Sequence, residues 1–190
     1  MKNAAGQVLG VRTEFDSVLS VIAPLGLVAA APRPALMVDL DAAGPAYPSG
    51  RSLAELVGEG PTRAELFGGA SRAGIALLRN GGVGWESALP VLEALAMRWP
   101  ALVLRVPEAM STGLPFPVVP VVPLFPGLLA SWGDRAAVWQ STGSGLTAPG
   151  PGPVLPALSR HSLLTLLAFR AEPRGRWVRA WGRIWDLPWP

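Results

Sequence analysis

The sequence predicts an α/β fold, a mostly parallel sheet sandwiched by helices in a single domain with a C-terminal helical extension. Short apolar runs alternate along the chain with segments of helical pattern. Most of these runs are continuously apolar rather than alternating, which is typical of strands covered on both faces. The chain has 190 residues, of which 50% are hydrophobic and 15% are charged. This composition excludes a disordered polar chain and is sufficient for one domain with its own core.

Three apolar runs in the first half of the chain are expected to be strands, at residues 8–12, 35–40 and 74–79. Residues 18–30, between the first two runs, are apolar enough for a buried helix. Asp16 or Ser17 is expected to be its N-cap. Pro24 and Gly26 are expected to interrupt it.

Two capping boxes mark helix starts between the second and third runs. Ser52 and Glu55 have the spacing at which each side chain binds the other residue's backbone N–H, and they open a short helix to about Val57. Thr62 and Glu65 repeat the same pattern ten residues later.

A helix is expected over residues 86–98, where Leu89, Leu92 and Ala96 recur at helical spacing. Pro90 falls near its first turn, a position where proline is tolerated. The remaining apolar runs are expected to be strands, at residues 101–106, 117–122 and 136–140. Two terminal helices are expected, at residues 159–170 and 176–186.

Composition divides the chain into three regions. Residues 1–145 form the α/β domain, 146–157 a Gly/Pro-rich connector and 158–190 a basic, Trp-rich helical segment. The chain has no cysteine, which excludes a disulfide framework and thiolate metal sites. His161 is the only histidine, and we expect it in the first turn of a terminal helix rather than in a catalytic triad. We therefore predict neither a catalytic residue nor a resident metal ion.

No membrane-spanning helix is expected. Residues 18–31 are apolar but shorter than the roughly 20 residues that span a bilayer, and prolines break the apolar run at 117–130. The N-terminal residues lack the apolar stretch of a signal peptide. These patterns predict a cytoplasmic protein, with a peripheral position at the inner face of the membrane as the alternative.

The stretch ALMVDLDAAGP, at residues 35–45, is an apolar run that ends in Asp39 and Asp41. SLAELVGEG follows at residues 52–60 and GIALLRNGG at 74–82. In this order the segments resemble the MinD/ParA family of P-loop ATPases, which includes pilus-assembly and septum-site relatives. That family has a strand ending in Asp-x-Asp, then Pro-Gln-Gly, then a short Ser-Leu-x-x-Leu-Leu helix.

Two departures from the family's pattern imply that its chemistry is lost. The family's phosphate-binding loop, Lys-Gly-Gly-x-Gly-Lys-Thr, should follow the first strand. Here no glycine lies between Arg12 and Ser17, and the only lysine is Lys2. Arg105 stands where the family has its magnesium-organising Asp, and a cation there would oppose a second cation. By the resemblance, Asp41 matches the hydrolysis-related Asp, which has little to catalyse without the loop and the metal.

Other interpretations of these segments stay open. The glycine-rich segment RNGGVGWES, at residues 79–87, also precedes a helix, but Trp85 occupies the Lys position, so we expect a glycine turn. Asp39 and Asp41 would share a strand face, an arrangement that allows Mg²⁺ binding through oxygens. The alternative is that both acids are solvated or cap neighbouring backbone N–H groups.

The C-terminal sequence RGRWVRAWGRIWDLPWP combines aromatic and basic residues at helical spacing. One helix face collects the apolar side chains Trp177, Trp181, Ile184 and Trp185. The opposite side collects Arg176, Arg179 and Arg183. Such a helix fits a membrane interface or a partner groove, and MinD-type proteins are similar in carrying an amphipathic C-terminal membrane helix. The alternative is that the tryptophans pack on the protein's own sheet, with the arginines outward.

Together these features predict a non-catalytic, MinD/ParA-like pseudo-ATPase without a cofactor. It would act as a scaffold or adaptor for a protein partner, in a pilus, secretion or division-site system. The alternatives are a peripheral membrane adaptor that uses the C-terminal helix, a weak nucleotide-binding protein, or an enzyme of another type acting at Asp39 and Asp41. A nucleic-acid partner is not expected, because the net charge is only +3.

Overall fold

The computed structural model describes residues 7–13, 17–62, 74–108, 110, 113–127, 132, 134–143, 145–168 and 175–189. Within these ranges the chain forms a seven-stranded sheet in the order β3-β2-β4-β1-β5-β6-β7, and neighbouring strands are parallel throughout. The strands are β1 (Gln7–Thr13), β2 (Ala35–Asp39), β3 (Ile75–Leu78), β4 (Ala101–Val106), β5 (Val118–Pro123), β6 (Val138–Gln140) and β7 (Val154–Leu155). The predicted α/β fold with a parallel sheet is confirmed.

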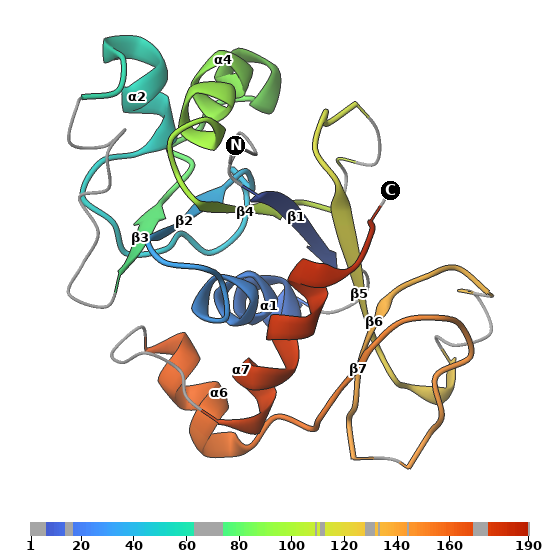
Figure 1. Ribbon diagram of the computed structural model, residues 1–190. Coiled ribbons are helices and arrows are strands. Elements are labelled where there is room, and N and C mark those ends of the chain that lie inside the picture. Colours follow the sequence, from blue (N-terminus) through green and yellow to red (C-terminus); the bar gives the residue numbers. More distant parts are fainter. Residues whose placement is uncertain are drawn as a thin grey trace.

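Helices cover both faces of this sheet (Figure 1). One face carries α2 (Leu53–Glu59) and α4 (Trp85–Ala96). The other carries α1 (Ser17–Ala29), α6 (Arg160–Leu167), α7 (Arg176–Trp181) and the 3-10 helix η1 (Gly182–Asp186). Along β2, Ala35 and Met37 join the core beneath α1, whereas Leu36 and Val38 join the core beneath α2 and α4. Covering both faces explains why these strands are apolar throughout.

The helix α1 continues without a break through Pro24 and Gly26, so the predicted interruption is wrong. The helix is buried between the sheet and the C-terminal helices, and this packing outweighs the hydrogen bond that proline removes. Gly26 has a packing function, because a Cβ at this position would collide with the rings of Trp177 and Trp181. Glycine therefore allows the C-terminal segment to approach the α1 backbone.

The capping box that opens α2 is confirmed. Ser52 Oγ accepts a hydrogen bond from the Glu55 backbone N–H at 3.3 Å, and the Glu55 carboxylate accepts one from the Ser52 N–H at 2.6 Å. The second predicted capping box, Thr62 with Glu65, cannot be compared because Glu65 lies outside the described ranges. Asp16, one of the two N-cap residues expected for the first helix, also lies outside them.

Two predictions about the C-terminal third of the chain need correction. The predicted connector, residues 146–157, contains the edge strand β7, which pairs with β6. The predicted terminal helix over 176–186 begins as α7 and continues as the 3-10 helix η1. Both α7 and η1 pack against α1 in the core that α1 shares with the sheet, so the C-terminal helical extension contributes to the core of the single domain.

Candidate functional site

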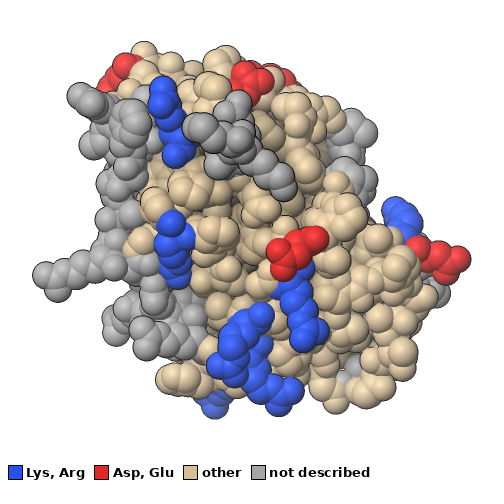
Figure 2. Space-filling model, in the orientation of Figure 1, with Lys and Arg blue, Asp and Glu red and all other residues tan. Residues whose placement is uncertain are grey.

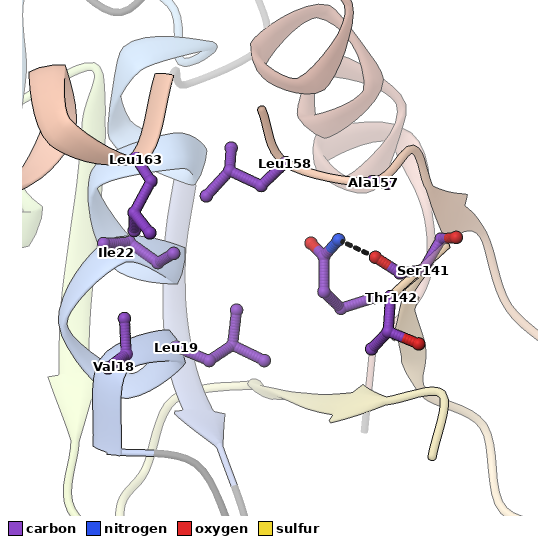
Figure 3. Close-up of a pocket in the computed structure, with 9 residues that line it drawn as sticks. Val18, Leu19, Ile22, Ser141, Thr142, Ala157, Leu158 and Leu163 are labelled. Carbon is purple, nitrogen blue, oxygen red and sulfur yellow. Dashed lines mark hydrogen bonds between the residues drawn. The ribbon is translucent and has the colours of Figure 1, made fainter. Parts of the chain in front are cut away.

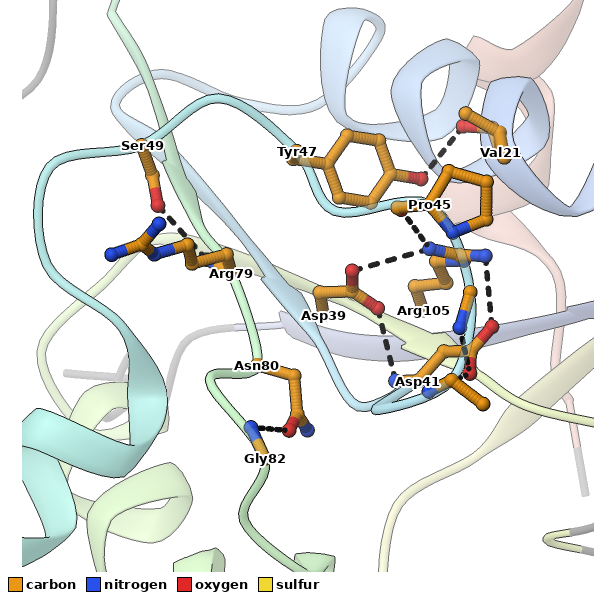
Figure 4. A network of polar contacts seen from close by, with 12 residues as sticks. Val21, Asp39, Asp41, Pro45, Tyr47, Ser49, Arg79, Asn80, Gly82 and Arg105 are labelled. Atoms are coloured by element: carbon orange, nitrogen blue, oxygen red, sulfur yellow. Dashed lines mark hydrogen bonds and ion pairs between the residues drawn. The ribbon is translucent and has the colours of Figure 1, made fainter.

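The two strand-end acids lie beside Arg105 at the carboxyl end of the sheet (Figure 4). Asp39 is the last residue of β2, and its partner in the register of the adjacent strand β4 is Arg105. Asp41 follows two residues after the strand. The parallel pairing of β2 with β4 therefore brings Arg105 to Asp39 and Asp41, which lie 66 and 64 positions before it in the sequence.

Arg105 forms the centre of a buried ion network. Its Nη1 donates to Asp39 Oδ2 at 3.2 Å and to the Pro45 carbonyl at 2.9 Å. Its Nη2 donates to Asp41 Oδ2 at 2.8 Å. The Arg105 side chain is 2% exposed and the Asp39 side chain 1%, so the contacts lie in a region of low dielectric where charge-assisted hydrogen bonds are strong. The guanidinium carbon also lies 5.4 Å from the centre of the Tyr47 ring, within the range of a cation–π contact.

The remaining carboxylate oxygens bind backbone N–H groups. Asp39 Oδ1 accepts from the Asp41 N–H at 2.9 Å. Asp41 Oδ1 accepts from the N–H groups of Ala43 at 3.0 Å and Gly44 at 2.9 Å. Each of the four carboxylate oxygens therefore has an internal donor. The structure favours the expectation that these acids cap backbone groups over the expectation that they hold Mg²⁺.

Gly44 and Tyr47 complete the site, and sequence reasoning missed both. A Cβ at Gly44 would collide with the Asp41 carboxylate and with Arg105 Nη2, so the network requires glycine here. The Tyr47 hydroxyl donates to the Val21 carbonyl of α1 at 2.7 Å, which ties the loop after β2 to that helix. Burial raises the pKa of Tyr47 well above its ordinary value. The only sequence signal was that Tyr47 is the single tyrosine of the chain.

The pKa of Asp39 is raised from its ordinary value of 3.8 to about 6. Burial is the largest cause, because desolvation disfavours the carboxylate. The positive charge of Arg105 and the hydrogen bond from the Asp41 N–H oppose this effect, and the negative charge of Asp41 adds to it. The two acids share one guanidinium, so the network carries a net charge of −1 when both are ionised.

We expect the fold to lose stability through Asp39 as the pH rises from about 4 to about 6. The folded-state pKa is the higher one, so the folded protein binds the proton more tightly than the unfolded chain does over this interval. The contribution is fully present below about pH 4 and lost above about pH 6, and it amounts to at most about 3 kcal/mol. Urea unfolding across this interval should show the wild-type protein losing stability relative to Asp39→Asn as the pH rises. A constant difference would contradict the assignment, and Asp134→Asn, at an exposed acid, is the control.

The described residues contain no group of three or more His, Cys, Asp or Glu side chains suited to a metal ion. At the strand ends, Arg105 occupies the space between the two acids that a divalent cation would need. The arrangement is therefore suited to fixing the loop after β2, and it presents no free base or nucleophile.

The glycine-rich segment between β3 and α4 is a turn held by its own asparagine. Asn80 Oδ1 accepts from the N–H groups of Gly82 at 2.7 Å and Val83 at 2.9 Å. Gly81 and Gly82 have φ values of 80° and 91°, which glycine adopts without strain. The predicted glycine turn is confirmed, and two of its N–H groups are already bound within the turn.

The structure corrects the prediction that the C-terminal tryptophan face meets a membrane or a partner. The four predicted side chains are buried: Trp177 (4% exposed), Trp181 (0%), Ile184 (0%) and Trp185 (7%). Trp177 Nε1 donates to Gln140 Oε1 at 2.7 Å, and Trp185 Nε1 donates to the Leu27 carbonyl at 3.2 Å. The alternative, packing on the protein's own core with the arginines outward, is the observed arrangement.

His161 lies in the first turn of α6, as predicted, and its side chain is exposed. Ser141 follows β6, and Ser144, the other serine considered for a triad, lies outside the described residues. Among the described residues, the His161 side chain has no hydrogen-bond or ion-pair partner.

A pocket of about 200 Å³ lies between α1, the end of β6 and the segment that leads into α6 (Figure 3). It is lined by Val18, Leu19, Ile22, Gln140, Ser141, Thr142, Ala157, Leu158 and Leu163. Its polar side chains are engaged internally, since Gln140 Nε2 donates to the Pro156 carbonyl and Thr142 Oγ1 to the Leu124 carbonyl. The volume is below that of typical small-molecule sites. Sequence reasoning missed it because its lining comes from three separate segments.

Fold and site together define an α/β protein with an all-parallel sheet, whose strand-end acids are bound by an internal arginine. Comparison with protein-family models and with curated proteins finds no match for this chain. None of the helices in the described ranges is both long enough and apolar enough to cross a membrane.

Proposed function

We propose that this chain is a non-catalytic, MinD/ParA-like pseudo-ATPase that acts in the cytoplasm as a scaffold or adaptor for a protein partner. The system would be a pilus, secretion or division-site assembly. The observation that carries the proposal is the ion network of Arg105 with Asp39 and Asp41. In an ATPase of this type, strand-end acids organise magnesium and the attacking water. Here the same kind of acids bind an internal guanidinium and backbone N–H groups.

The order of the strands in the sheet also supports the proposal of a P-loop-like ancestry. β4, which carries Arg105, lies between β1 and β2 in the sheet. The carboxyl ends of β1 and β2 therefore flank the end of β4, where a P-loop ATPase would hold its nucleotide and metal. In this sequence the segment between β1 and α1 has no lysine and no glycine. A triphosphate placed there would lack both the amino group and the metal that neutralise its charge.

We expect no Mg²⁺-dependent ATP hydrolysis and no calorimetric ATP binding at micromolar concentrations. The physical reason is that Arg105, the cation of the described site, is already bound to Asp39 and Asp41 and is not available to neutralise the phosphates. The measurements are isothermal titration of ATP with Mg²⁺ or with EDTA, and phosphate release over hours. Micromolar binding together with hydrolysis that EDTA abolishes would refute the proposal. Micromolar binding without hydrolysis would favour the alternative of a weak nucleotide-binding protein.

The alternative of a membrane adaptor receives less support. An interfacial helix binds by burying its apolar face in the lipid. The corresponding face of α7 and η1 is packed against α1, and Trp181 is fully buried there.

A further inference from the structure

The C-terminal segment presents a row of exposed arginines, which we name the arginine face: Arg176, Arg179 and Arg183. Their spacing of three and four residues places them on one side of α7 and η1. The tryptophans of the same segment point the other way, into the core. Figure 2 shows basic side chains gathered in the lower centre of the view, over the region where Figure 1 places α7.

The net positive charge of the chain is concentrated in the C-terminal part of the sequence. Residues 158–190 contain six arginines and two acids, a net charge of +4. Residues 1–157 contain ten basic and eleven acidic residues, a net charge of −1. The net charge of +3 therefore comes entirely from the C-terminal segment. Such an asymmetry is typical of a surface that attracts an anionic partner.

The arginine face has no ion-pair partner within the described ranges. Among the described residues, none of its three guanidinium groups lies within ion-pair distance of a carboxylate. Arg51 and Arg105, by contrast, bind Glu59 and the strand-end acids. The exposed acid of the same segment, Asp186, reduces the positive charge of the face without binding any of the three arginines.

The backbone that carries these arginines is held rigidly. α7 has only six residues and would not be stable alone. Trp177 and Trp181 pack edge to face, with ring centres 5.5 Å apart, and Trp177 is hydrogen-bonded to Gln140 of the sheet. A partner would therefore meet a surface whose backbone is already ordered, and less free energy would be lost on binding.

We propose that the arginine face docks an acidic segment of a partner protein, with carboxylates at helical spacing. This inference rests on the adaptor function proposed above and names the chemistry of its partner. From Arg176 to Arg183 the helix rises by about 10 Å, so carboxylates spaced by three or four residues on a partner helix would match the arginines. Each guanidinium offers the fork that binds a carboxylate through two hydrogen bonds.

A membrane surface and a nucleic acid fit the same observations less well. Binding to anionic lipid by a few basic residues is weak without an inserted apolar face, and that face is buried here. Nucleic-acid binding surfaces combine basic groups with exposed aromatic rings on which bases stack. The rings of Trp177, Trp181 and Trp185 are not available for stacking.

The test uses a dye-labelled, alanine-rich helical peptide. It carries three glutamates, each three or four residues after the one before. Its affinity is measured by fluorescence anisotropy in low salt, against the full chain and two triple variants. The first is Arg176→Gln, Arg179→Gln and Arg183→Gln, which keeps side-chain length and helix propensity. The matched control is Arg51→Gln, Arg79→Gln and Arg98→Gln, which removes the same charge from the side of the sheet that carries α2 and α4.

We expect the first variant to bind the peptide at least tenfold more weakly than the wild-type chain, and the control to change affinity less than threefold. Equal weakening by both variants would overturn the proposal, because net charge would then explain the binding. Absence of binding by the wild-type chain would overturn it as well. The wild-type chain and both variants are also co-sedimented with vesicles of 30% phosphatidylserine. If the wild-type chain binds the vesicles but not the peptide, and only the first variant loses vesicle binding, the arginine face binds lipid and the proposal is overturned.

The peptide-binding experiment and the ATP experiment can fail independently of each other. Mg²⁺-dependent ATP hydrolysis by the wild-type chain would refute the pseudo-ATPase proposal, while a selective loss of peptide binding in the first variant would still establish the arginine face. Near-ultraviolet circular dichroism of both triple variants checks that the tryptophan packing is retained.

Discussion

Replacement of Arg105 by methionine is expected to destabilise the folded protein by about 3–5 kcal/mol at pH 7. The change leaves Asp39 and Asp41 without the cation that neutralises them, in a site where Asp39 is almost completely buried. It also leaves the Pro45 carbonyl without its donor and removes the contact with the Tyr47 ring. Urea-induced unfolding followed by tryptophan fluorescence measures the difference. Arg98→Met, at an exposed arginine, is the matched control and should change stability by less than about 1 kcal/mol.

A combined variant distinguishes lost charge balance from lost packing. Asp39→Asn and Asp41→Asn, added to Arg105→Met, remove both negative charges and keep the oxygens that accept from backbone N–H groups. Replacing a whole buried ion network by neutral groups is often close to neutral for stability, so we expect the combination to recover at least half of the loss. If Arg105→Met alone costs less than about 1 kcal/mol, the network is not a major source of stability.

Most of the sheet could be predicted because its strands are buried on both faces. β4 is the clearest example, since its six residues Ala101–Val106 are all buried and the predicted bounds are the observed ones. β7 could not be predicted because it has only two residues, Val154 and Leu155, within a Pro/Gly-rich segment. No periodicity can be recognised over two residues, and the strand depends on pairing with β6.

The candidate site was only partly predictable. Asp39 and Asp41 were singled out from local pattern and Arg105 from the family resemblance, but the arginine was interpreted as a charge that opposes a metal ion. Its pairing with the acids depends on β2 and β4 being neighbours in register, which is a property of the topology. The position of Gly44 against Arg105 also depends on that pairing, so spacing along the chain carried no signal for it.

The apolar face of the C-terminal helix illustrates a general limit. Amphipathic spacing shows that one face will be covered, but it does not identify what covers it. Here the cover is α1, and its complementary feature is Gly26, about 150 residues earlier in the sequence. From sequence alone Gly26 was interpreted as a helix interruption, although it is the residue that admits the two tryptophan rings.

Replacement of Trp181 by alanine is expected to destabilise the protein by about 3–5 kcal/mol. The side chain is fully buried and packs edge to face on Trp177, against Gly26 of α1. Its removal leaves a cavity at the contact between the C-terminal segment and α1, and rigid neighbours collapse into such a space only partly. Urea unfolding measures the loss, with Leu187→Ala as the control on the same segment, because Leu187 is 41% exposed.

The same contact can be tested from the α1 side. Gly26→Val places two methyl groups where the rings now lie, and we expect it to destabilise the protein by a comparable amount. If Trp181→Ala costs no more than Leu187→Ala, the segment does not pack on α1 in solution, and its apolar face becomes available to a membrane or a partner. If both core variants are strongly destabilising, the tryptophans serve the fold, and within α7 and η1 the exposed arginines are side chains that a proposed partner could contact.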